Sequence, residues 1–332
     1  MIILAWAGFV AIVGAILAVD LGLINRNPHV ARFREALAFA GLTVVLAGAF
    51  AAFIYAAYNA HWLGLGLQVD QVGHVANTGR VAALKFATGY LVELSLSMDN
   101  VFVIALIFQH LRVPSAYQHR VLFWGVFGAL AMRGAMIGIG AGLVARYSWI
   151  LYVFGAFLLV TAVRMLSSRT EQESPEEAAV VRFLRRHFRI TERLHGDRFL
   201  VVVDAARYLT PLAVTLVLIE TSDLIFAIDS IPAIFAVTAD PFLVFTSNVF
   251  AILCLRSLYF GLAGLIARFR HLKVSLAVIL AIVGAKMLAG TLLEPIFGES
   301  MNLWLLVIVA LVLAGGAVAS VAGEPKPADP TR

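Results

Sequence analysis

The distribution of apolar and charged residues along this chain is typical of a protein built from membrane-crossing helices. Apolar runs of about 20 residues, the length that crosses a bilayer as a helix, recur through nearly the whole chain. Read against the charged breaks between them, they predict nine helices, over residues 2–24, 36–58, 85–109, 120–145, 147–166, 208–236, 243–266, 272–292 and 303–323. We therefore expect an all-α, polytopic membrane protein with a single transmembrane domain over residues 1–323.

Composition supports this fold class and removes several alternatives. Of the 332 residues, 61% are hydrophobic and 14% are charged, and the mean hydropathy of +0.93 exceeds that of soluble globular domains. The one cysteine, Cys254, lies inside an apolar run, so neither a disulfide framework nor a thiolate metal site is available. The first apolar run is longer than a signal-peptide core, and we expect it to be retained as a helix. Residues 324–332, rich in proline and charge, are expected to form a disordered tail.

The basic residues predict the orientation in the membrane. Alternate connections hold 19 of the 25 Lys and Arg residues, the opposite set holds three, and three fall within spans. Because cytoplasmic connections carry the excess of basic residues, the N-terminus is expected outside and the C-terminus in the cytoplasm. The segment Arg182 to Arg198 is basic enough to suggest nucleic acid, but orientation already explains its charge and no nucleic-acid motif surrounds it. We expect the connector 167–207 to be cytoplasmic and no nucleic acid to bind.

The chain contains an internal repeat of three helices, with one copy over 85–166 and the other over 208–292. Three pairs of strings carry it: Leu96-Ser-Met-Asp99-Asn100 with Phe226-Ala-Ile-Asp229-Ser230, Arg133-Gly-Ala-Met with Arg256-Ser-Leu-Tyr, and Ala162-Val-Arg164-Met-Leu with Gly284-Ala-Lys286-Met-Leu. Because three is odd, the second copy enters the membrane from the other side. The repeat is therefore predicted to be inverted, an architecture typical of transporters.

Two of the predicted spans carry an unusual number of acidic residues. The candidate site residues are Glu93, Asp99 and Asn100 in the third helix and Glu220, Asp223 and Asp229 in the sixth, with Ser97, Ser230, Pro232, Arg133 and Arg256 in support. A charge at the bilayer centre costs about 2.5–3.5 kcal/mol, so five carboxylates and two arginines would cost roughly 20 kcal/mol if unpaired. That exceeds the usual net stability of about 5–15 kcal/mol. These groups must be compensated by one another, by water or by a bound ion.

Helical geometry predicts which of these groups meet. At 100° per residue, Glu93, Ser97 and Asn100 share one helix face. Glu220, Asp223 and Ser230 share another. Asp99 and Asp229 lie about 100° away from these faces, so only local unwinding would bring them in. Pro232 has no N–H to bond the carbonyl of Ile228, which suggests such unwinding beside Asp229. The resulting expectation is a ladder of oxygen ligands across the bilayer, with both aspartates near its middle.

The ligand atoms that these side chains offer indicate which ion would be transported. Oxygen ligands without Cys, Met or His suit Mg²⁺, Ca²⁺ or Mn²⁺ rather than copper or zinc. Five carboxylates against Arg133 and Arg256 leave a surplus of about three negative charges, which a divalent cation or protons would remove. An alternative stays open, in which the arginines pair with aspartates in a purely architectural polar core. Arg164 and Lys286 lie nearer the span ends, where snorkelling to the interface would account for them.

The chain also resembles the TerC family, Alx-type members included. The strings that carry the resemblance are Glu93-Leu-Ser-Leu-Ser-Met-Asp99-Asn100-Val-Phe-Val and Glu220-Thr-Ser-Asp223-Leu-Ile-Phe-Ala-Ile-Asp229-Ser-Ile-Pro232-Ala-Ile-Phe-Ala, with Asp240-Pro-Phe and Phe245-Thr-Ser-Asn-Val-Phe-Ala among the shorter ones. The resemblance implies a bacterial inner-membrane protein of the wider lysine-exporter superfamily, linked to manganese efflux, to metal loading of exported enzymes and, by name, to tellurite resistance. It also implies that the six acidic and amide positions are functional. Many members place lysine after the first glutamate, where this chain has Leu94.

Three functions follow as hypotheses. The first is a transporter that exports a divalent cation, with manganese favoured and calcium an alternative, by alternating access and with protons as the counter-ion. The second is a membrane partner that transports nothing and passes metal or stress signals to the secretion machinery. The third, an intramembrane aspartyl hydrolase using Asp99 and Asp229, lacks the Gly-x-Gly-Asp string of such enzymes, so we expect no enzyme and no organic cofactor.

Overall fold

A computed structural model of the chain describes residues 2–19, 33–72, 74–167, 175–191, 193–203, 206–262, 272–297 and 300–322. The predicted disordered tail, 324–332, lies outside these residues. The side chains of Asp99 and Arg256 also lie outside the description, although the helices that carry them are described.

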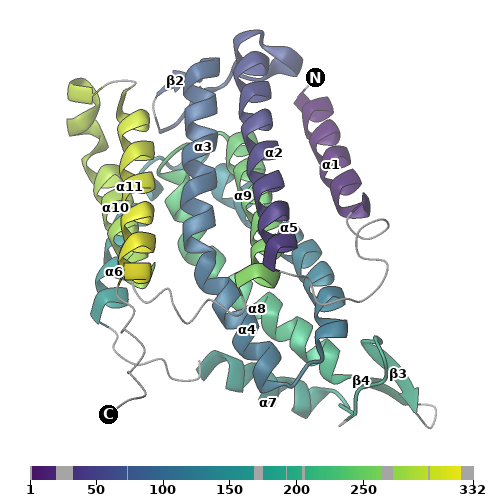
Figure 1. Cartoon of the computed structure of the whole chain (residues 1–332). Helices are drawn as coiled ribbons and strands as arrows, with labels where there is room; N and C mark the ends of the chain where they lie inside the picture. The colour runs from purple at the N-terminus through teal and green to yellow at the C-terminus, as the bar shows by residue number, and fades with distance from the viewer. Residues whose placement is uncertain are drawn as a thin grey trace, which may run out of the picture.

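The described part of the chain is mostly helical, as predicted (Figure 1). Its α-helices are α1 (Ile2–Val19), α2 (Phe33–Asn59), α3 (Gly79–Leu96), α4 (Met98–His110), α5 (Ser115–Arg146), α6 (Ile150–Ser167), α7 (Pro175–His187), α8 (Pro211–Phe235), α9 (Pro241–Leu262), α10 (Leu272–Phe297) and α11 (Ser300–Ala322). Six segments of this part are helical, long and apolar enough to cross a membrane, and three shorter apolar helices accompany them. The polytopic membrane fold is thereby confirmed, and each predicted span falls on a helix, with α3 and α4 together forming the third.

Two small antiparallel hairpins were not predicted. β1 (Val69–Asp70) pairs with β2 (Val75–Ala76) in the connection between α2 and α3, which also contains the short 3₁₀ helix η2 (Trp62–Gly64). β3 (Leu200–Val203) pairs with β4 (Ala206–Leu209) in the connector before α8. The sixth span therefore begins at Pro211 rather than at 208. Thr210 caps it, since its hydroxyl accepts a hydrogen bond from the amide of Ala213 at 3.4 Å.

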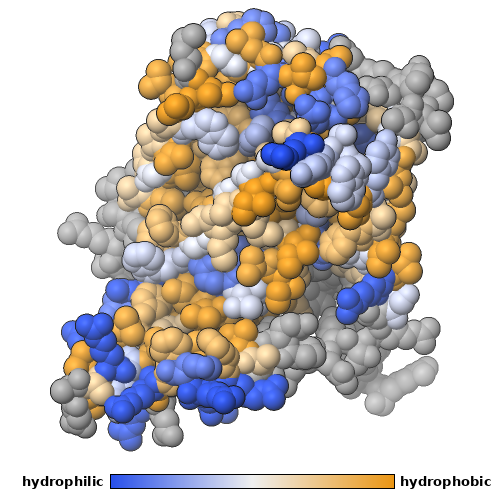
Figure 2. All heavy atoms as spheres, turned by 180° about the vertical axis from the view of Figure 1, so that it is seen from behind, coloured by the Kyte–Doolittle hydropathy of each residue, from blue (hydrophilic) through white to orange (hydrophobic). Residues whose placement is uncertain are grey.

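The two hairpins lie at opposite ends of the bundle (Figure 1). On the face shown in Figure 2, the surface between these ends is largely hydrophobic, and hydrophilic side chains gather toward its top and bottom. Large apolar residues such as Val45, Ile139 and Val160 are more than half exposed on the outer faces of α2, α5 and α6. An apolar belt between polar ends is the surface that a bilayer requires.

Helix contacts place the two acidic helices inside the bundle. α8 contacts α3, α4, α5 and α6, while α9 packs against α2, α3 and α5. α6 and α10 pack closely where Gly155 meets Gly284: a Cβ on Gly284 would stand 2.9 Å from the carbonyl oxygen of Gly155. Side chains in the middle of α3 and α8 are therefore enclosed by protein on several sides.

The helix break occurs in the first predicted repeat, not in the second. α3 ends at Leu96 and α4 begins at Met98, with Ser97 as a single turn residue between them. α8 stays helical from Pro211 through Pro232 to Phe235. The expectation that Pro232 unwinds the helix beside Asp229 is therefore wrong. A proline removes one hydrogen bond, and neighbouring groups inside a bundle can compensate for that loss without unwinding.

Candidate functional site

A wholly buried arginine joins the acidic residues of the two predicted repeats. Arg133, on α5 and 2% exposed, forms an ion pair through Nη1 with Oε1 of Glu93 on α3. The same nitrogen donates to Oγ of Ser230 at 3.2 Å and to Oδ1 of Asn248 at 3.0 Å. Nη2 lies 3.5 Å from Oδ1 of Asp223 on α8. One guanidinium thus connects α3, α5, α8 and α9 in the bundle interior.

The predicted helix faces lie toward this arginine. Ser97 donates to Oε1 of Glu93 at 2.5 Å, and Asn100 donates from Nδ2 to Oδ1 of Asp223 at 2.9 Å. Asp223 therefore shares one oxygen between Asn100 and Arg133. The break at Ser97 leaves Glu93 and Asn100 on the same side because Ser97 keeps a right-handed helical conformation and its amide still donates to the carbonyl of Glu93.

Glu220 lies beside this group, against a glycine. A Cβ built on Gly128 of α5 would stand 1.9 Å from Oε1 of Glu220, so the carboxylate occupies the space that a side chain there would fill. Asp223 follows Glu220 by three residues on the same face of α8. The two carboxylates therefore lie near each other on α8.

Several oxygens in this region have no hydrogen-bond partner. Among the described residues, the buried atoms without one include Oε2 of Glu93, Oδ1 of Asn100 and Oε2 of Glu220, together with Nε of Arg133 and the hydroxyl of Tyr90. A buried carboxylate oxygen without a partner is costly. Three such oxygens from neighbouring elements are the donor set that a hard cation would satisfy.

The structure does not hold an assembled cluster of ligands. Within the described residues, no three acidic, histidine or cysteine side chains come together closely enough to hold a metal ion. Instead, Arg133 occupies the position between Glu93 and Asp223. The residues fit a cation in their chemistry, but not as a closed coordination shell.

Asp229 departs from the prediction. It faces α6, where the hydroxyl of Thr161 donates to its Oδ1 at 3.5 Å, and not the arginine that binds its neighbour Ser230. Asp229 is therefore not on the face of α8 that meets Arg133 in this structure, and its role as a metal ligand stays a prediction. The reason is the helix phase: without unwinding at Pro232, Asp229 remains about 100° from the face of Ser230.

A second buried polar cluster, centred on Asp70 of β1, was missed. The Asp70 carboxylate pairs with Nζ of Lys85 on α3 at 2.8 Å, with side-chain exposures of 0% and 3%. It also accepts hydrogen bonds from Asn77, Thr238 and the amide of Ala239. This cluster ties the β1–β2 hairpin to the connection between α8 and α9.

The Asp70 carboxylate is held ionised by its surroundings. Burial alone would raise its pKa, but the charge of Lys85 and hydrogen bonds from Lys85, Thr238 and Val72 outweigh burial, so the pKa lies below its ordinary value. Asp240, next to this cluster, shows the opposite shift: burial raises its pKa, although Tyr58 donates to it at 2.8 Å. The only sequence signals for the cluster were isolated charges in a turn-rich segment.

Lys286 also differs from expectation. It is 8% exposed, and its Nζ donates to the carbonyl oxygen of Ala236 at 2.9 Å and lies 3.5 Å from Oδ1 of Asn302. Snorkelling therefore does not describe it. A lysine in the middle of α10 is too far from the helix ends for its amine to reach the interface, so it binds polar groups inside the bundle.

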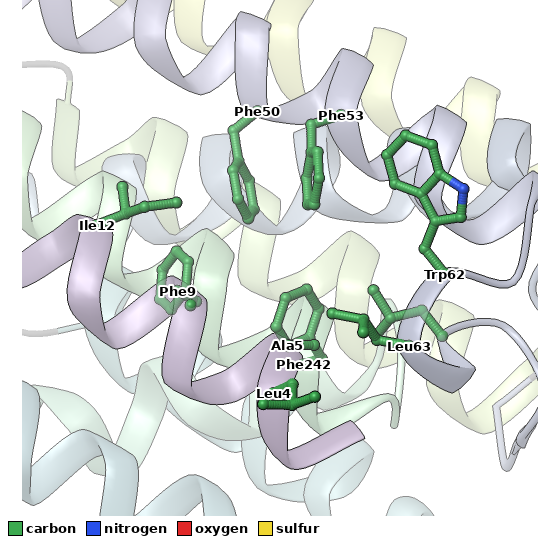
Figure 3. A pocket seen from close by; sticks show the side chains of 11 residues that line it. Leu4, Ala5, Phe9, Ile12, Phe50, Phe53, Trp62, Leu63 and Phe242 are labelled. Carbon is green, nitrogen blue, oxygen red and sulfur yellow. The ribbon is translucent and has the colours of Figure 1, made fainter. Parts of the chain in front are cut away.

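An apolar hollow of about 420 Å³ lies between α1, α2, η2 and α9 (Figure 3). Its lining includes Leu4, Phe9, Phe53, Trp62 and Phe242, and none of the predicted site residues. Without a carboxylate in its wall, it has no ligand for a metal ion.

Comparison with known proteins agrees with the resemblance read from the motifs. Residues 78–324 match the integral membrane protein TerC family. An uncharacterised membrane protein of Myxococcus xanthus is 48% identical over 282 residues, covering 85% of this chain and 82% of that protein. The Alx protein of Escherichia coli K12, whose name proposes a membrane-bound redox modulator, is 45% identical over 290 residues, covering 86% and 85%. No solved structure matches. The chain therefore belongs to the TerC family of integral membrane proteins.

Proposed function

We propose that this protein is a bacterial inner-membrane transporter that exports a divalent metal cation, with Mn²⁺ the favoured cargo. The observation that carries the proposal is the set of unpartnered buried oxygens on Glu93, Asn100 and Glu220 around Asp223. Asp99 and Asp229 stay proposed as ligands further along the path.

Charge supports a divalent cargo. The described side chains of this group include three carboxylates, those of Glu93, Glu220 and Asp223, and one guanidinium, that of Arg133, which pairs with Glu93 and approaches Asp223. When all are ionised, two negative charges remain. Uncompensated charge at membrane depth costs several kcal/mol, and one divalent cation would balance it. Carboxylate and amide oxygens favour Mn²⁺, Ca²⁺ or Mg²⁺ over softer metals, and the family resemblance favours manganese.

The helix contacts support alternating access by an inverted repeat. The first helix of the first repeat is α3 with α4, and it contacts α8, the first helix of the second repeat. Each of these also packs on the middle helix of the other repeat: α3 packs on α9, and α8 packs on α5. The third helices, α6 and α10, pack on each other. A two-fold axis in the membrane plane would produce these reciprocal contacts, and the shared site would then lie between the repeats.

The proposed orientation places the N-terminus outside and the C-terminus in the cytoplasm. Support comes from α7, whose last turn contains Arg185, Arg186 and His187, at the opposite end of the bundle from the β1–β2 hairpin (Figure 1). Basic residues concentrate on cytoplasmic connections.

A redox role, suggested by the name of the Alx relatives, is the second candidate. Dithiol chemistry within one chain needs two thiols, whereas this chain has only Cys254, which is buried. In this candidate the protein would act as a membrane partner of secretion or stress systems and would move no metal.

Flux measurements separate the two candidates. Purified protein in proteoliposomes is given a Mn²⁺ gradient, and entry is followed with a metal-sensitive dye, then repeated with Ca²⁺, Mg²⁺ and Zn²⁺. We expect Mn²⁺ flux that falls at least tenfold in Asp223→Asn and in Glu93→Gln. The control is Asp197→Asn, an exposed carboxylate in the connector paired with Arg120, which should leave flux unchanged. Absence of flux from folded wild-type protein would instead favour the membrane partner.

A further inference from the structure

We propose that Arg133 is a tethered cation that takes the place of the metal at Glu93 and Asp223 whenever the transporter is empty. The inference rests on the proposed function and concerns how the same site releases its cargo and returns. It follows from the acceptors that Arg133 binds, from the oxygens that it leaves unpartnered, and from its complete burial.

The guanidinium and a metal ion would use the same carboxylates. Arg133 pairs with Oε1 of Glu93 and approaches Oδ1 of Asp223, one from each predicted repeat. A divalent ion bridging the repeats would need these two groups as its charged ligands. With Arg133 between them, the described residues form no metal-holding cluster. Arg133 therefore lies where an ion bridging Glu93 and Asp223 would bind.

The contacts of Arg133 are incomplete, which suits replacement of the guanidinium by a metal ion at the carboxylates. Its distance to Asp223 is 3.5 Å, whereas Asn100 holds the same oxygen at 2.9 Å. Its Nε has no partner, and neither does Oε2 of Glu93. A purely architectural arginine at this depth would be expected to satisfy all its donors, because an unpaired buried N–H is costly. The neutral acceptors Ser230 and Asn248, at 3.2 and 3.0 Å, could keep the guanidinium bonded after the carboxylates turn to a metal.

Electrostatics gives Arg133 two consequences for transport. A fixed positive charge within a few ångströms of the metal lowers metal affinity, because like charges repel strongly where water is scarce. In the empty protein, the same charge neutralises one carboxylate and reduces the cost of moving an unloaded acidic site through its occluded state. Arg133 should thus weaken binding and promote the empty return step.

Arg133→Gln tests both consequences, because it removes the charge and keeps a hydrogen-bonding side chain. We expect its Mn²⁺ affinity to rise at least tenfold, equivalent to about 1.4 kcal/mol. In proteoliposomes, net Mn²⁺ flux should fall at least tenfold, while exchange of Mn²⁺ across the membrane continues, since exchange needs no empty return. The matched control is Arg146→Gln at the exposed end of the same helix, which should change none of these quantities.

The outcomes separate this inference from the proposed function. If wild-type protein neither binds nor moves Mn²⁺, the proposed function fails. If wild-type protein transports but folded Arg133→Gln binds Mn²⁺ more weakly, or loses exchange together with net flux, Arg133 only positions the carboxylates and the inference is overturned. If Arg133→Gln is unstable without metal, two other results are required. Mn²⁺ must raise the melting temperature of Arg133→Gln more than it raises that of wild type. Arg133→Lys, which keeps the positive charge, must retain net Mn²⁺ flux. Failure of either result also overturns the inference.

Discussion

Gly128 and Glu220 are in direct contact across α5 and α8, so that a methyl group on Gly128 would stand 1.9 Å from one carboxylate oxygen of Glu220 and 2.5 Å from the other. The glycine therefore makes room for a charged group inside the bundle. Because the group that must move is the end of a flexible side chain, a substitution here should displace the carboxylate rather than unfold the protein.

Gly128→Ala should consequently reduce Mn²⁺ affinity about tenfold, and Mn²⁺ flux with it, while the melting temperature changes little. Gly138→Ala is the matched control, since Gly138 lies on the same helix and a Cβ there meets nothing within 4 Å. Both changes gain the same helix propensity, so their difference isolates the contact with Glu220. Equal affinities in the two variants would show that Glu220 is not a ligand.

Asp70→Asn should destabilise the protein by about 3–5 kcal/mol, because it leaves the buried amine of Lys85 without its counter-charge. The same substitution at Asp197, whose side chain is 55% exposed and pairs with Arg120 on the surface, should cost no more than about 0.5 kcal/mol. Denaturant unfolding in detergent measures both. Similar losses in the two variants would argue against the Asp70 cluster as a structural tie between the β1–β2 hairpin and the connection between α8 and α9.

The Asp70 cluster also predicts a pH dependence of stability. The folded-state pKa of Asp70 lies below its unfolded value, so its contribution is complete above the ordinary carboxyl value of about 4 and is lost as the pH falls through the folded-state pKa. Asp240, whose pKa burial raises, acts in the opposite sense: its contribution is present at low pH and is lost as the pH rises through its raised pKa.

Melting temperatures of wild type, Asp70→Asn and Asp240→Asn between pH 3 and 8 separate the two contributions. The difference between wild type and Asp70→Asn should shrink below about pH 4. The melting temperature of wild type relative to that of Asp240→Asn should fall as the pH rises above about 4, because the contribution of Asp240 is lost there. A constant difference between wild type and Asp70→Asn across the whole range would contradict the ionised state of Asp70.

The close crossing of α6 and α10 depends on the glycines at their contact. Gly284→Ala would place a methyl group 2.9 Å from the carbonyl oxygen of Gly155 and 3.1 Å from Cβ of Leu158, so the helices must separate. We expect a loss of about 1–3 kcal/mol in stability. Gly290→Ala on the same helix, where a Cβ meets nothing within 4 Å, should be neutral or stabilising. If both variants melt alike, the helices are not held at this distance by the glycines.

Most of the fold could be predicted from the sequence because bilayer thickness sets the length of an apolar helix, and each predicted span falls on a helix. The hairpins could not be predicted, since strands of two to four residues carry no readable periodicity. The pairing of Asp70 with Lys85 was missed for a related reason. It depends on the path of the connection between α2 and α3, which neither charge alone indicates.

The site was partly predictable, because helix phase is a local property. The face of Glu93, Ser97 and Asn100 and the face bearing Asp223 follow from 100° per residue and meet in the structure. The position of Asp229 depended on whether Pro232 unwinds α8, and that outcome is decided by packing around the helix rather than by the proline alone. The role of Asn248 as an acceptor for Arg133 depends on the contact of α9 with α5, which only the tertiary structure specifies.

In this account, the oxygens of Glu93, Asn100, Glu220 and Asp223 bind a divalent cation. Equilibrium binding of Mn²⁺ to purified protein, followed by the loss of the free-ion signal in electron paramagnetic resonance, tests it most directly. We predict one saturable Mn²⁺ per chain in wild type, lost in the double variant Glu93→Gln with Asp223→Asn and kept in Asp197→Asn. Undiminished binding in the folded double variant, or none in wild type, would contradict the claim.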